Sequence, residues 1–153
     1  MQKHVKRRKR RKRRVKEPLT EELLDELLEA PSPAAFMDAH PAANRTLSEY
    51  LNELLAQKGL ERADIIHAAD LNETYGYQIF MGQRKPSRNK VLQIVFAMGL
   101  DLREANRALK AAGVNELYCK NRRDAIIIFC LTHGCSLQQV NEELYRFKED
   151  TIC

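Results

Sequence analysis

From residue 46 onward, the sequence is divided into short segments whose apolar residues recur at helical spacing. Three of these segments open with the spacing of a capping box, in which two side chains satisfy free amides of the first helical turn. The pairs are Thr46 with Glu49, Asp101 with Glu104, and Ser136 with Gln139. Glycine, which closes helices in the left-handed conformation, follows several segments, at Gly59, Gly99 and Gly113. No strand pattern is present, so the sequence predicts an all-α protein.

The positive charge is concentrated at the N-terminus. Residues 1–16 hold eleven of the 26 lysines and arginines and no acid, which leaves 15 basic against 21 acidic residues in the rest of the chain. Because this run repels itself and has nothing to bury, residues 1–17 are expected to form a disordered basic tail. Three interpretations stay open: a nucleic-acid-binding arm, a nuclear-localisation-like run, or a start-site artefact with translation beginning near Val15.

Residues 18–45 form an acidic region. The stretch LTEELLDELLEA places leucines at helical spacing among acidic residues, which predicts an acidic amphipathic helix at 20–29. The stretch PSPAAFMDAHPAAN holds three prolines, which favours a linker with at most one helical turn.

Residues 46–113 contain the signals for five helices. The second and third are short and meet across Asp70, Leu71 and Asn72, and Asn72 is a good N-cap for the third helix. Ser87 can cap the fourth, RNKVLQIVFAM, which is apolar nearly all round and is therefore expected at the centre of the core.

Residues 114–153 look like a copy of the fourth and fifth helices, shifted by 35 positions. The matching pairs include Arg88 with Arg123, Gly99 with Gly134, Asn106 with Asn141, and Leu109 with Leu144. A single helix pair cannot bury its own apolar face, so we expect this C-terminal pair to pack on the preceding domain.

The stretch from Leu60 to Ser87 resembles the Xre/Cro-type, lambda-repressor-like helix-turn-helix family. The matching residues are Leu60, Ile65, Ala69, Leu71, Tyr75, Gln78, Ile79 and the ending GQRKPS. This resemblance implies a five-helix DNA-binding domain over 46–113, extended here by the helix pair of 114–153, with a recognition helix at 72–81.

The chain departs from the family pattern at three positions. Gly76 replaces a buried aliphatic residue, and Ile66 replaces a small one, which we interpret as a compensating exchange. Asp70 stands where the turn usually has glycine, and aspartate tolerates left-handed geometry better than most residues.

The resemblance also implies the DNA contacts, by position. The residues expected to face the bases in the major groove are Glu73, Thr74, Tyr77 and Gln78. Gln78 is the leading candidate, because glutamine can pair with adenine through two hydrogen bonds. The residues expected to contact phosphates are Arg62, Gln83, Arg84, Lys85, Ser87, Arg88 and Asn89.

Other chemistry is less well supported. Cys130, His133 and Cys135, with Cys119 nearby, suggest zinc, but their spacing is irregular and the repeat aligns Cys130 and Cys135 with apolar positions. Buried thiols are therefore favoured, and no metal or cofactor is expected. No phosphate loop, nucleophile elbow or metalloprotease motif is present, so we do not expect an enzyme.

The resemblance implies a sequence-specific transcriptional regulator or antitoxin-like repressor that binds double-stranded DNA as a homodimer, and we expect a bacterial, cytoplasmic, nucleoid-associated protein. A protein partner could bind the acidic helix 20–29 or the C-terminal helices, and no membrane association is expected. The alternative is a helical adaptor that has kept the fold without specific DNA binding. It is favoured by the nearly neutral charge of residues 46–113, with nine basic against eight acidic residues.

Overall fold

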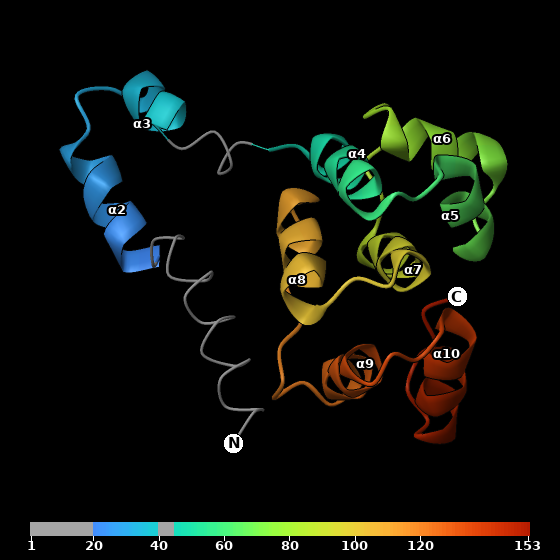
Figure 1. Cartoon of the computed structure of the whole chain (residues 1–153). Coiled ribbons are helices and arrows are strands. Elements are labelled where there is room, and N and C mark those ends of the chain that lie inside the picture. The colour runs from blue at the N-terminus through green and yellow to red at the C-terminus, as the bar shows by residue number, and fades with distance from the viewer. Residues whose placement is uncertain (1–19, 40–44) are drawn as a thin grey trace, which may run out of the picture. The chain divides into compact units, whose positions relative to one another are not determined.

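The computed structural model describes residues 20–39 and 45–153, and every regular element within these ranges is a helix (Figure 1). The helices are α2 (Thr20–Glu29), α3 (Pro33–Ala39), α4 (Leu47–Lys58), α5 (Arg62–Ala68), α6 (Glu73–Phe80), α7 (Arg88–Met98), α8 (Leu102–Ala111), α9 (Arg122–Thr132) and α10 (Leu137–Arg146). The predicted all-α class is confirmed for these ranges. The predicted basic tail, residues 1–17, lies outside them.

The chain divides into two compact units, residues 1–44 and 45–153. In the described part of the first unit, α2 is the predicted amphipathic helix, and its Leu24, Leu27 and Leu28 are exposed. The prediction of at most one helical turn in the proline-rich segment is wrong, because α3 spans seven residues. Pro33 occupies the first helical position, where its fixed φ is compatible with a helix, and the Ser32 hydroxyl accepts a hydrogen bond from Ala35 N–H.

In the second unit, the predicted helix boundaries follow from local chemistry. All three capping boxes form, with each N-cap side chain and its N3 partner bonded reciprocally to backbone amides. Gly59 and Gly99 end α4 and α7 in the left-handed conformation, with φ of 63° and 65°. The ends of these helices are therefore specified by residues close in sequence.

Helix α7 lies at the centre of this unit, as predicted. It packs against α5, α8 and α10, while α4 covers α6 and α8. Seven of its side chains are buried, including the polar Gln93. The Gln93 amide donates to the Ala69 carbonyl at 2.8 Å, which ties α7 to the end of α5.

The internal repeat is confirmed by hydrogen bonds that recur 35 residues apart. Asn106 Oδ1 accepts from Leu117 N–H at 2.8 Å, and Asn141 Oδ1 accepts from Ile152 N–H at 2.7 Å. Arg88 donates to the carbonyls of residues 115 and 116, and Arg123 donates to those of residues 150 and 151. Each helix pair is thus fastened to the segment that follows it in the same way.

The two repeats pack on each other reciprocally. Helix α7 contacts α10, and its counterpart α9 contacts α8. Arg88 of the first repeat bonds Asp124 of the second, while Arg123 of the second bonds Asn89 of the first. Because each contact from the first repeat to the second recurs from the second to the first, the repeats are related by an approximate two-fold axis, like the subunits of an isologous dimer.

Candidate nucleic-acid interface

The turn between α5 and α6 is built from residues that tolerate its backbone conformation. Asp70 has φ of 57°, the left-handed geometry expected from its place in the sequence. Asn72 caps α6, since its side chain accepts from Tyr75 N–H at 3.1 Å. Leu71 between them is partly buried and packs against the core. This turn fixes the direction in which α6 leaves α5.

Close packing of α5 on α6 depends on Gly76. A Cβ atom at this position would lie 2.5 Å from Ile66 Cγ2, which is well inside van der Waals contact. The large residue on α5 and the missing side chain on α6 therefore fit each other, which confirms the predicted exchange.

Helix α6 has one buried and one exposed side. Gly76, Ile79 and Phe80 face the core, and Asn52 of α4 donates to the Phe80 carbonyl at 2.8 Å. No local pattern predicts this Asn52 anchor, because the two residues are 28 positions apart. The four residues predicted to face DNA are on the other side: Glu73, Thr74 and Tyr77 are exposed, and Gln78 is partly exposed.

Two arginines flank the exposed side of α6. The Arg62 guanidinium lies over the Tyr77 ring at 4.8 Å. Arg84 Nε donates to Gln78 Oε1 at 3.0 Å, and its guanidinium is 6.0 Å from the Tyr75 ring. Because a guanidinium only donates, the Gln78 amide oxygen must face Arg84. The predicted two-bond pairing of Gln78 with adenine would therefore require this bond to open.

The segment after α6 carries the predicted phosphate contacts. Gly82 has φ of 77°, which lets the chain turn away from the helix. Gln83, Arg84 and Lys85 after it are exposed. Ser87 is exposed and caps α7, and its hydroxyl accepts from Lys90 N–H at 3.4 Å.

Arg88 and Asn89, also predicted to contact phosphates, make contacts within the protein instead. The Arg88 guanidinium forms a bidentate pair with Asp124 at 2.8 and 2.9 Å, and Asn89 accepts from Arg123 at 3.0 Å. This geometry favours a structural role for both residues. The sequence shows that Arg88 recurs as Arg123, but it does not show that Asp124 is the acidic partner of Arg88.

Asp124 is buried, and its charge is stabilised by several donors. Burial is the largest single influence and would raise its pKa. Hydrogen bonds from Arg88 and Tyr118 N–H, together with the charges of Arg88 and Arg123, outweigh burial and lower the pKa below its ordinary value. Asp124 is therefore ionised at neutral pH and joins the two repeats.

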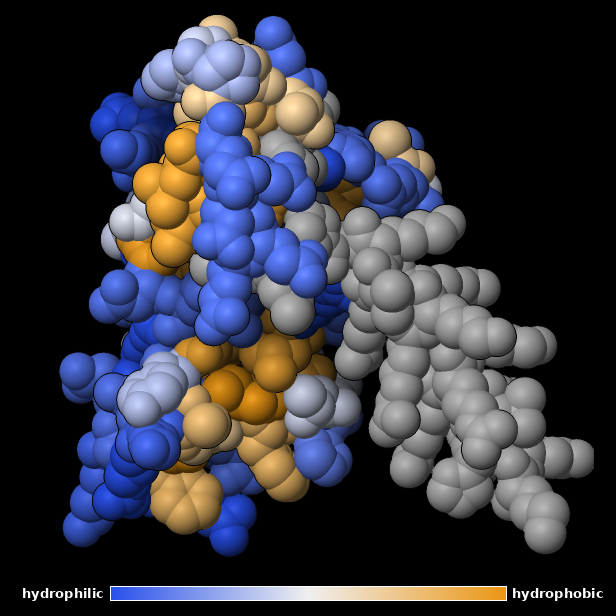
Figure 2. Space-filling model, turned by 90° about the vertical axis from the view of Figure 1, so that its left-hand side faces the viewer, coloured by the Kyte–Doolittle hydropathy of each residue, from blue (hydrophilic) through white to orange (hydrophobic). Residues whose placement is uncertain are grey.

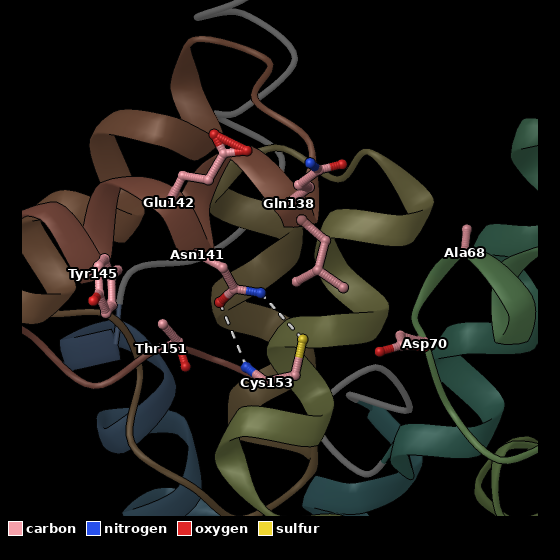
Figure 3. A pocket seen from close by; sticks show the side chains of 9 residues that line it. Ala68, Asp70, Gln138, Asn141, Glu142, Tyr145, Thr151 and Cys153 are labelled. Carbon is pink, nitrogen blue, oxygen red and sulfur yellow. Dashed lines mark hydrogen bonds between the residues drawn. The ribbon is translucent and has the colours of Figure 1, made fainter.

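Outside the α6 surface, the structure has free cysteines and an open groove. Burial, with Cys135 beside it, raises the pKa of the Cys130 thiol to about 12. Among the described residues, no group of three His, Cys, Asp or Glu side chains could hold a metal ion. An open groove of about 580 Å³ lies between α10 and the α5–α6 turn, where Asp70, Asn141 and Tyr145 are among its lining residues (Figure 3).

Comparison with known proteins gave no guide to function: no family model, curated protein or solved structure matches the chain. None of the described helices is both long and apolar enough to cross a membrane.

Proposed function

We propose that this protein is a sequence-specific DNA-binding regulator of the Xre/Cro helix-turn-helix type, with α6 as its recognition helix. The observation that carries the proposal is the two-sided character of α6. Its inner side is held by α4 and α5, while its outer side presents polar groups between two arginines. A helix of this width fits the major groove, where such groups reach base edges.

In this arrangement the roles of the exposed residues differ. Glu73, Thr74, Tyr77 and Gln78 contact bases, since they lie on the outer side of α6. Gln83, Arg84 and Lys85 follow the helix directly and contact the sugar-phosphate backbone, with Arg62 on the opposite flank. Arg88 and Asn89 hold the C-terminal repeat and are not part of the interface.

The second candidate function is a helical adaptor that binds a protein. Exposed leucines favour it, because Leu24, Leu27 and Leu28 lie exposed on the acidic helix α2. An acidic amphipathic helix of this kind suits an apolar groove with basic edges.

The two functions are separated by selecting preferred duplexes from a random DNA library and measuring affinity by fluorescence anisotropy. We expect Gln78→Ala to weaken binding to the preferred duplex about tenfold or more and to leave binding to unrelated DNA unchanged. Lys85→Ala should weaken binding to all duplexes and lower the salt slope by about one. Lys110→Ala, an exposed change on α8, is the matched control and should alter neither.

Selection that returns no preferred sequence, or equal affinity for every duplex, would contradict the regulator and favour the adaptor. A preferred sequence whose recognition is insensitive to Gln78→Ala, Thr74→Ala and Tyr77→Ala together would show that a surface other than α6 reads the bases.

A further inference from the structure

The approximate two-fold relation between the repeats shows what the second repeat lacks. In the first repeat, α7 is covered by α5 and α8 is covered by α4. Within residues 45–153, no comparable helix pair packs on the equivalent sides of α9 and α10. The second repeat therefore keeps an open side where the first one is covered.

Apolar side chains occupy this open side. Phe129 is 60% exposed, whereas its counterpart Ile94 is fully buried. Phe147 is 45% exposed, whereas its counterpart Ala112 is buried at 5%. Ile126 lies one turn before Phe129 and is partly exposed, and His133 stacks on the Phe129 ring at 4.0 Å between centroids. We call Ile126, Phe129, His133 and Phe147 the α9 face.

Large exposed apolar groups on adjacent turns indicate an interaction surface more strongly than a single exposed side chain does. Figure 2 shows that apolar side chains gather in patches on the side of the molecule that faces the viewer. Phe129 is also a larger apolar side chain than Ile94, the buried residue at the equivalent position of the first repeat, although this side of the second repeat is open. Such a group suits a partner that covers it.

Two arginines beside the α9 face lie close to acidic side chains. Arg122 lies 3.4 Å from Glu149, and Arg146 lies 3.7 Å from Glu143. Both arginines at this rim thus have an acidic neighbour. These pairs lower the net charge at the rim, so a second copy can approach it without strong repulsion.

The ends of α9 are complementary in an antiparallel pair. A two-fold axis through the middle of α9 places Ile126 against the partner's Phe129, and Phe129 against the partner's Ile126. It also brings the Arg122 guanidinium to the carboxyl-terminal end of the other α9, where the helix dipole places partial negative charge. The same residues serve on both sides, as an isologous interface requires.

We propose that the α9 face is the homodimer interface of this protein, with a second copy of the chain as its occupant. The proposal does not depend on DNA binding. It is tested by sedimentation equilibrium of the full chain over a range of concentrations, with a reducing agent present because Cys119 and Cys153 are exposed. The wild-type chain should be a reversible dimer.

Phe129→Asp should raise the dimer dissociation constant about thirtyfold or more, because an aromatic anchor is lost and two charges are buried near each other. Phe129→Ala should raise it less, without adding charge. The matched control is Tyr145→Asp, since Tyr145 is an exposed aromatic residue of α10 that lines the groove instead (Figure 3). Its dissociation constant should equal that of the wild type.

Circular dichroism and thermal unfolding at a concentration below dimerisation should be the same for all three variants and the wild type. A wild-type chain that stays monomeric at the highest concentration would overturn the proposal. So would a dimer that persists unchanged in both Phe129 variants, or one that Tyr145→Asp weakens equally.

Discussion

At the residue scale, Gly76 shows how one missing side chain controls a helix crossing. Glycine costs about 1 kcal/mol relative to alanine inside a helix, so the local sequence alone would favour alanine. The contact with Ile66 reverses this preference, because a Cβ atom would lie 2.5 Å from Ile66 Cγ2. The tertiary fit thus outweighs the helix propensity.

We therefore predict that Gly76→Ala destabilises the protein by about 1–3 kcal/mol, since α5 and α6 must move apart. In the Ile66→Ala background, the same substitution should stabilise it by about 0.5–1 kcal/mol, because only the propensity term remains. Chemical denaturation of the four proteins of this cycle measures both values. Equal effects in the two backgrounds would show that the clash is absent.

Asp124 is the second residue that joins distant parts of the chain. Asp124→Asn should cost about 2–4 kcal/mol at neutral pH, because the Arg88 guanidinium loses its charged partner. The folded-state pKa is lowered, so this stabilisation is fully present above the ordinary value of 3.8 and is lost as pH falls through the folded-state pKa.

The stability difference between wild type and Asp124→Asn should accordingly shrink below about pH 4, as followed by denaturation at a series of pH values. The exposed substitution Asp64→Asn serves as control and should change stability by less than about 0.5 kcal/mol. A difference that is constant with pH would mean that the ionised carboxylate is not what stabilises the fold.

At the scale of elements, Gln93 connects the central helix α7 to the turn before α6. Its amide nitrogen donates to the Ala69 carbonyl, and its amide oxygen is buried without a hydrogen-bond partner. Burying the polar Gln93 side chain costs free energy, and its hydrogen bond to the Ala69 carbonyl at the end of α5 offsets part of that cost. The position of the turn is therefore set from the core.

Gln93→Met, which keeps the shape and removes the donor, should destabilise the protein by about 1–2 kcal/mol. Amide hydrogen exchange should increase most in α5 and the turn, because the Ala69 carbonyl is left unsatisfied. Gln57→Met on the exposed side of α4 is the control. No loss of stability, or loss without faster exchange in α5, would mean that the Gln93 bond is dispensable.

At the scale of the whole molecule, charge is divided between the N-terminal run and the rest of the chain. Residues 1–16 hold eleven of the 26 basic side chains, while the nine basic residues of 46–113 are nearly matched by eight acidic ones. Non-specific affinity for DNA arises mainly from released counterions, so it should depend on the N-terminal run. Base recognition should depend on α6.

Removing residues 1–16 should thus lower affinity for every duplex and reduce the slope of log affinity against log salt by several units. The preference for the selected duplex over unrelated DNA should stay within about twofold, because the tail does not contribute to base readout. Anisotropy titrations at several salt concentrations measure both quantities. Loss of the preference together with the tail would show that α6 is not the reading element.

Most helix boundaries were predictable from residues close in sequence. Capping boxes and C-terminal glycines act within a single turn, so Thr46, Asp101 and Ser136 mark helix starts whatever the rest of the chain does. The 35-residue repeat was also visible, because equivalent packing requires similar side chains. Helix α3 was missed because prolines were interpreted as breaks, although Pro33 sits where a helix accepts one.

The sequence alone predicted the helices other than α3, their caps and the exposed polar side of α6, since each depends on local chemistry and periodicity. Which polar residues remain available for an interface depends on tertiary packing. Arg88 and Asn89 resemble loop residues of an interface in sequence, but Asp124 and Arg123 engage them from more than 30 positions away. Such long-range pairings depend on how whole helix pairs pack, which no local pattern specifies.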